Sequence, residues 1–90
     1  MAKVDVISPG SEQSGNSVTK SNCDTTDASK LRYMISPWES SDGDWFGPGT
    51  PAGLSGNTVD ITGWANLFDH ENQNADKKKW KSVILMQLDT

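Results

Sequence analysis

The sequence predicts a small β-rich domain, mainly β with α+β as the alternative, built as a small antiparallel sheet or a sandwich- or barrel-like unit. Three observations lead to this prediction. Short runs of β-branched and apolar residues recur along the chain, clusters of Gly, Pro, Ser and Asn separate them, and the longest apolar run lies near the end. Ninety residues make one domain. We expect at most one or two short helices in it.

Two segments in the first half carry a strand signal. Lys3 to Ile7 combines Val4, Val6 and Ile7 and is stopped by a Ser-Pro-Gly turn. Residues 31–35 also suit a strand that ends at Ser36-Pro37. The Asp-Thr-Thr-Asp sequence just before them is able to cap a helical turn over residues 28–32, so strand and turn both stay open for this stretch.

The second half contains the clearer patterns. Residues 57–62 alternate, with Val59 and Ile61 on one side, which is typical of a strand. A short amphipathic helix is expected after Gly63, because apolar residues follow at helical spacing from position 64. Residues 80–88 contain four consecutive large apolar residues, which predicts a central strand covered on both faces.

A long polar segment separates the first strand from the rest. Only Val18, Cys23 and Ala28 are apolar between residues 8 and 30. A compact domain rarely contains an irregular loop of that length. We therefore predict that residues 1–30 form an N-terminal strand plus an extended polar arm, and that residues 31–90 form the compact domain.

Charge is distributed unevenly along this acidic chain, whose net charge is −4. Residues 33–76 contain seven acidic residues and no lysine or arginine. Such a surface repels nucleic acid, which is bound through cations that neutralise phosphates, so we expect no direct nucleic-acid partner. The lysine cluster at residues 77–81 is more typical of a solvated loop or of charges that protect a strand.

The N-terminal sequence lacks the apolar core of a signal peptide, and no apolar stretch is long enough to span a membrane. The expected location is the cytoplasm, where the protein is made without a signal peptide, with a virion as a further destination. We expect no membrane partner. A single cysteine excludes an intramolecular disulfide.

The sequence predicts no catalytic, cofactor or metal site. Cys23 and His70 are the only residues of their types, and Cys23 lies in the most polar segment, where we expect a surface thiol. Asp69-His70-Glu71 are consecutive residues that point in different directions, so they cannot close on one metal ion. The acids Glu39, Asp42 and Asp44 surround an Asp-Gly turn. We therefore predict that the protein is not an enzyme.

Aromatic residues are the remaining candidates for a site. Trp38, Trp45, Phe46 and Trp64 lie within 27 residues, beside turns. They suit the core of a leucine-poor chain, a protein interface, in which tryptophan is enriched among hot spots, or a platform for a sugar ring. We select these four residues as partner-binding candidates. Val4 and Val6 join them, because the first strand is able to add to the edge of a neighbouring sheet.

These features favour a non-enzymatic structural or interaction protein that binds a larger protein assembly. A virion accessory protein, either a capsid decoration (cement) protein or a tail protein, is the narrower prediction, with capsid or tail proteins or copies of itself as partners. One alternative is a small acidic inhibitor or immunity-type protein that blocks a basic site on a nucleic-acid enzyme. The third is a carbohydrate-binding β domain that uses the same tryptophans.

Overall fold

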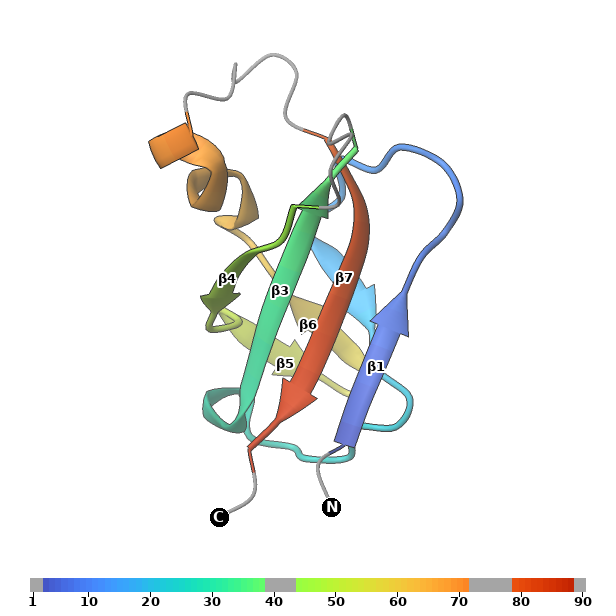
Figure 1. Ribbon diagram of the computed structural model, residues 1–90. Coiled ribbons are helices and arrows are strands. Elements are labelled where there is room, and N and C mark those ends of the chain that lie inside the picture. Colours follow the sequence, from blue (N-terminus) through green and yellow to red (C-terminus); the bar gives the residue numbers. More distant parts are fainter. Residues whose placement is uncertain (1–2, 39–43, 72–78, 89–90) are drawn as a thin grey trace.

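A computed structural model describes residues 3–38, 44–71 and 79–88, with only the backbone given for residues 68–71. The described chain forms two antiparallel sheets, which confirms the predicted β-rich fold class. The larger sheet has the order β1-β7-β3-β4 and the smaller sheet has the order β2-β6-β5. The two sheets lie one behind the other, with the larger sheet nearer to the viewer (Figure 1).

The strands are short, and most of them lie where the sequence predicts. The larger sheet consists of β1 (Lys3–Ile7), β7 (Trp80–Gln87), β3 (Leu31–Pro37) and β4 (Phe46–Gly49). The smaller sheet consists of β2 (Ser17–Thr19), β6 (Thr58–Asp60) and β5 (Gly53–Ser55). Two 3-10 helices complete the described elements, η1 (Ala28–Lys30) and η2 (Trp64–Glu71).

The core lies between the two sheets, and the period of two along each strand selects its members. Every second residue of β3, from Leu31 to Ile35, is buried, and so are Val83 and Leu85 on β7. The smaller sheet contributes Val18 and Val59 from the opposite side. The rest of the buried cluster comprises Cys23, Ile61, Trp64 and Trp80.

The sequence left a helical turn and a strand open for residues 28–35, and the structure contains both, a turn followed by a strand. The Oδ1 atom of Asp27 accepts a hydrogen bond from the backbone N–H of Ser29 at 3.0 Å and so caps η1. The turn lasts only three residues, and Leu31 then begins β3 in extended conformation. Pairing with β7 on one side and β4 on the other favours the strand over a longer helix.

Three strands were not predicted. β2 and β5 are three residues long and lie in polar or glycine-containing segments, which gives them almost no periodicity. β4 runs through Gly47-Pro48-Gly49, which has the composition of a loop. A proline is tolerated there because β4 is the edge strand of its sheet and needs hydrogen bonds on one side only.

Residues 8–30 do not extend away from the domain as an arm. β2 pairs with β6 in the smaller sheet, and Val18, Lys20 and Cys23 are buried. β1 pairs with β7 along all five of its residues. The segment belongs to the domain, because backbone pairing holds Gln13 and β2 in place, and side chains on β1 and β7 hold residues 21–25.

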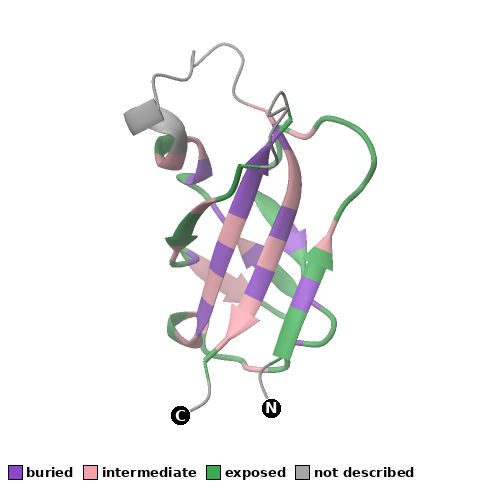
Figure 2. Cartoon of the chain, in the orientation of Figure 1, coloured by how far each residue is buried: buried purple, intermediate pink, exposed green. Residues whose placement is uncertain are grey.

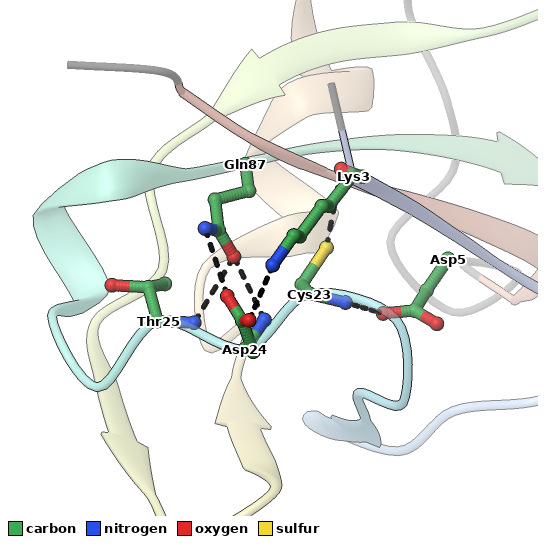
Figure 3. A network of polar contacts seen from close by, with 6 residues as sticks. All are labelled: Lys3, Asp5, Cys23, Asp24, Thr25 and Gln87. Atoms are coloured by element: carbon green, nitrogen blue, oxygen red, sulfur yellow. Dashed lines mark hydrogen bonds and ion pairs between the residues drawn. The ribbon is translucent and has the colours of Figure 1, made fainter. Parts of the chain in front are cut away.

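Two side chains of the larger sheet fix residues 21–25 in place, and Figure 3 shows their contacts with residues 23–25. The carboxylate of Asp5 accepts the backbone N–H groups of Ser21, Asn22 and Cys23 at 3.0, 2.7 and 2.9 Å. The amide oxygen of Gln87 accepts the next two N–H groups at 2.8 and 3.0 Å. Five consecutive backbone donors therefore end on side chains of the larger sheet, a non-local pattern that no local propensity predicts.

Candidate protein-interaction face

One side of the larger sheet, turned away from the core, is apolar. In an antiparallel sheet, residues opposite one another place their side chains on the same face. Met86 of β7 lies between Val4 of β1 and Arg32 of β3, and Ile84 lies between Val6 and Met34. Leu88 continues this side of β7, since its N–H bonds to the carbonyl of Lys30 at 2.8 Å in the same register. We call the six apolar residues of this side the outer face: Val4, Val6, Met34, Ile84, Met86 and Leu88.

The outer face is accessible in the described structure. Val6 is 67% exposed, and Val4 and Leu88 are 39% and 40% exposed. Met34, Ile84 and Met86 are half-buried by their neighbours in the sheet. Buried and half-buried residues alternate from Leu31 to Ile35 of β3 and from Val83 to Met86 of β7, and over this part of the sheet no described element lies on the viewer's side (Figure 2). The outer face is therefore a contiguous apolar surface across three strands.

β7 departs from the usual pattern of a two-layer antiparallel protein. Such a strand alternates apolar residues toward the core with polar residues toward water. β7 instead places Val83 and Leu85 in the core and Ile84 and Met86 on the other side. Its predicted central position is correct, since it lies between β1 and β3. The prediction that both of its faces are covered is wrong for the described residues, because only one face packs against the smaller sheet.

The predicted aromatic candidates divide into two groups. Trp64 is 4% exposed, and its Nε1 atom donates to Oδ1 of Asn16 at 2.8 Å. Phe46 packs against the core cluster from β4. Trp64 therefore belongs to the interior and Phe46 is half-buried against it, which supplies large apolar volume that a leucine-poor chain needs.

Trp38 and Trp45 remain at the surface. They are 37% and 41% exposed and lie at the two ends of the connection between β3 and β4. The backbone N–H of Trp38 bonds to the carbonyl of Lys79 at 2.9 Å, which holds it beside the start of β7. Both indoles therefore lie at the end of the larger sheet at which β3 finishes and β7 begins. Their role in binding a partner stays a prediction.

Both edges of the larger sheet are protected against pairing with another strand. At the β1 edge, Nδ2 of Asn22 donates to the carbonyl of Val4 at 3.1 Å and occupies a backbone acceptor. Asp5 points inward from the same strand, and a buried charge on an edge strand opposes edge-to-edge association. At the β4 edge, Pro48 has no N–H to offer. The geometry therefore favours contact through the face of the sheet over strand addition at β1.

The charges around the outer face follow from the strand sequences. Asp5 is the single acid in the four strands of the larger sheet, and it faces the core. Arg32 is the charged residue opposite Met86, and its guanidinium donates to the carbonyls of Ser29 and Leu31 at 2.8 and 2.7 Å. Among the described residues, the strands of the larger sheet therefore place no carboxylate on the outer face.

Two titrating groups next to β1 are structural. Burial alone raises the pKa of Asp5, but the backbone hydrogen bonds from Asn22, Cys23 and Ser21 outweigh it and hold the pKa below 3.8. Burial, followed by the hydrogen bond and the charge of Asp5, raises the pKa of Cys23 to about 11. Cys23 is 1% exposed, so the predicted surface thiol is wrong. A buried thiol held in its protonated form is a poor nucleophile.

An open hollow of about 490 Å³ lies on the smaller sheet, away from the outer face. Its lining includes Asn16, Ser17, Leu54, Thr58, Asp60 and Thr62. Hydrogen bonds from the hydroxyl and N–H of Thr62 lower the pKa of Asp60. The lining contains no aromatic ring, and Oδ1 of Asn16 already accepts the hydrogen bond from Nε1 of Trp64. This hollow therefore lacks the stacking platform on which the carbohydrate prediction depends.

The acidic residues and the histidine that the sequence offered as candidates form no site among the described residues. No group of three or more His, Cys, Asp or Glu side chains is close enough to hold a metal ion in the described part of the chain. Glu39 and Asp42, and the side chains of Asp69, His70 and Glu71, lie outside the described residues. Among the described residues, no helix is long and apolar enough to cross a membrane.

No protein-family model, no curated protein and no solved structure matches the chain. The outer face must therefore be interpreted from its own chemistry. Sequence reasoning found Val4 and Val6 but missed Met34, Ile84, Met86 and Leu88. The signal that could have identified them is that alternate residues 84, 86 and 88 are apolar as well as residues 83 and 85. The chain has too few other apolar residues to cover both sides of such a strand, so one side was to be expected at the surface.

Proposed function

We propose that this chain is a non-enzymatic interaction protein that binds a larger protein assembly through the outer face. One observation carries the proposal: β7 is apolar on both sides, and the described chain covers only one. Contiguous exposed apolar patches on small proteins are typical of protein contact sites. Trp38 and Trp45 are exposed at one end of the same sheet and are of a residue type that often acts as a binding hot spot.

The narrower prediction of a virion accessory protein has lost one of its supports. It depended partly on an arm over residues 8–30 that orders on a partner, and this segment lies in the domain. What still favours it is the small size of the chain and a sheet face free for lateral contact with a shell. Capsid and tail proteins therefore remain partners to test.

The acidic-inhibitor alternative uses a different part of the surface. Of the seven acids in residues 33–76, only Asp44 and Asp60 have described side chains, and neither lies in a strand of the larger sheet. An inhibitor that acts through these acids is steered by charge, and its affinity falls steeply with added salt. Binding through an apolar face changes little with salt, because burial of apolar area drives it.

The test compares a substitution on the outer face with a matched substitution on the smaller sheet. A tagged wild-type chain captures binding proteins from an extract of the cells that make it, and the affinity of each identified protein is then measured for two variants. Val6→Lys places a charge on the most exposed residue of the outer face, and Thr58→Lys makes the same change in charge on an exposed strand residue of the smaller sheet. Val6→Lys should weaken binding at least about tenfold, as loss of an interface anchor does, and Thr58→Lys should leave it unchanged.

Two results contradict the proposal. Equal affinities for the two variants mean that the outer face does not bind the partner. A loss of affinity of more than about a hundredfold between low and high salt, with little effect of Val6→Lys, favours the acidic inhibitor.

A further inference from the structure

The geometry points to a binding site for small organic amines in the hollow of about 490 Å³ on the smaller sheet. The ligand is a primary ammonium group on a short aliphatic chain, and the carboxylate of Asp60 is its counter-ion. The volume of the hollow falls in the range of small-molecule sites in proteins. This site goes beyond the proposed function, because it lies away from the outer face and does not depend on it.

Asp60 lies in the middle of the smaller sheet. In the register of this sheet it is opposite Ser17 of β2 on one side and opposite Gly53 of β5 on the other. Residues opposite one another share a face of a sheet, and the next residues along, Val18 and Val59, belong to the core. The row that contains Asp60 therefore lies on the outward side. Asp60 is the one charged residue among the described residues that line the hollow, so the hollow favours a cation over an anion.

The acceptors in the hollow suit an ammonium group. Oδ1 of Asp60 accepts the backbone N–H of Thr62 at 2.8 Å and also its hydroxyl, which keeps the carboxylate in one orientation. Among the described residues, Oδ2 of Asp60 has no hydrogen-bond partner. The hydroxyl groups of Ser17, Ser55 and Thr58 belong to the same lining. An ammonium group has three N–H donors and no acceptor, so one carboxylate oxygen and neighbouring hydroxyl oxygens match what it needs.

Gly53 leaves open the space beside Asp60. A Cβ atom on Gly53 would meet nothing within 4 Å, and its φ does not lie in the left-handed region. Neither crowding nor the backbone therefore requires a glycine at this position, and a side chain here would project into the hollow. Leu54, which is half-buried, adds an apolar part to the lining. The carbon chain of the amine lies over this part of the hollow while its ammonium group contacts Asp60.

An NMR titration of the isotope-labelled full chain with n-butylamine, at neutral pH and constant ionic strength, tests the inference. Backbone amide signals of residues 16–17, 53–55 and 60–62 should shift and saturate, with a dissociation constant on the order of 1 mM. The uncharged n-butanol has the same carbon chain and should not bind. The lysine compound α-N-acetyl-lysine amide separates two sources of the ammonium group. A higher affinity for it than for n-butylamine supports a lysine side chain of another protein as the ligand, and a lower affinity supports a free amine.

Matched variants separate the hollow from its carboxylate. Asp60→Asn removes the charge and should weaken n-butylamine binding at least about tenfold, as loss of a hydrogen bond to a charged group does. Asp27→Asn is the control, because Asp27 accepts the N–H and the hydroxyl of Ser29 in the same way but does not line the hollow. It should leave the affinity unchanged. Gly53→Leu keeps the charge but fills the hollow, and it should also weaken binding at least about tenfold.

Several results overturn the inference. Amide shifts that do not saturate, or that n-butanol produces equally, exclude an ammonium site. Equal shifts around Asp27 and Asp60 mean that any exposed carboxylate is sufficient and that the hollow contributes nothing. An affinity that Asp60→Asn leaves unchanged overturns the inference even if Gly53→Leu fails to fold. Val6→Lys should not alter amine binding, so failure of this site leaves the proposed function standing.

Discussion

The carboxylate of Asp5 should be one of the most important single groups for the stability of this protein. It lies on β1, is 5% exposed, and accepts three consecutive backbone N–H groups from residues 21–23 at 2.7–3.0 Å. Its Oδ2 atom takes two of these bonds and its Oδ1 atom takes the third. Asp5→Asn keeps the shape of the side chain, removes the charge and turns one acceptor into a donor that faces an N–H group.

The magnitude follows from these bonds. A hydrogen bond to a charged group contributes about 1.5–3 kcal/mol and a neutral one about 0.5–1.5 kcal/mol, so the two bonds that survive lose roughly 1 kcal/mol each. The third donor, on Asn22, turns partly to water because this residue is exposed. Release of a buried charge offsets part of the loss. We expect Asp5→Asn to lower the free energy of unfolding by about 2–3 kcal/mol, which lowers Tm by about 10–20 °C in a domain of this size.

The pH dependence supplies an internal check. The pKa of Asp5 is lower in the folded state than its ordinary value of 3.8, so the carboxylate stabilises the fold above that value. This contribution is lost as the pH falls below 3.8 toward the folded-state pKa. The stability difference between wild type and Asp5→Asn should therefore be full at about pH 6.5 and should shrink at about pH 3. Asp24, Asp27 and Asp60 also have lowered pKa values, but they titrate in both proteins, so the difference isolates Asp5.

Urea unfolding followed by tryptophan fluorescence measures the effect, with Asp27→Asn as the control. Asp27 is an exposed helix cap, and asparagine caps a helix as well as aspartate does, so this variant should unfold like the wild type. Unfolding of Asp5→Asn at the same urea concentration as the control would show that the carboxylate does not stabilise the fold. A difference between wild type and Asp5→Asn that is as large at about pH 3 as at neutral pH would show that the charge of Asp5 is not its cause.

Three further outcomes are expected. Cys23, with a pKa of about 11 against an ordinary 9.0, should react with a disulfide reagent at neutral pH at least about a hundredfold more slowly in the folded chain than in urea, and stoichiometric labelling within seconds would contradict its burial. Gly47→Ala should cost about 1–3 kcal/mol in urea unfolding, because Gly47 has a φ of 132° and a Cβ atom would lie 2.7 Å from the carbonyl oxygen of Tyr33. Gly15→Ala, with open space around it, is the control, and equal effects would refute the steric argument. Leu85→Ala should cost about 2–5 kcal/mol and the neighbouring Ile84→Ala clearly less, since only Leu85 fills the core; equal losses in a thermal melt would mean that Ile84 is as well packed as Leu85.

The sequence predicts the strands that have a strong period and misses those that depend on the rest of the fold. β1, β3, β6 and β7 all contain apolar residues at alternate positions, and each lies where this pattern indicates. β4 has no such pattern. It is a strand because it pairs with β3 at the edge of the larger sheet, and its own sequence does not indicate this pairing. Residues 21–25 resemble a solvated arm in composition, yet the side chains of Asp5 and Gln87 hold them. Hydrogen bonds between residues so far apart in the sequence have no local signature.

The candidate site was predictable to a similar extent. Exposure at Val4 and Val6 follows from an edge strand with alternating residues. Among the tryptophans, composition alone does not separate Trp64 in the core from Trp45 at the surface, because all of them lie beside turns. The decisive information is the register of β1, β7 and β3, which brings apolar residues from three distant segments to one face.

The use of scarce apolar residues on an exposed sheet face is evidence for a partner. A chain of this length buries a limited share of its surface, and its margin of stability is correspondingly small. It contains only fourteen Val, Ile and Leu residues. Four of them, Val4, Val6, Ile84 and Leu88, lie on the outer face together with Met34 and Met86. If water covered this face in the working state, polar residues there would maintain the sheet equally well and would limit aggregation. Protected edges beside an unprotected apolar face indicate that the face, and not the edge, is the surface that this protein offers to others.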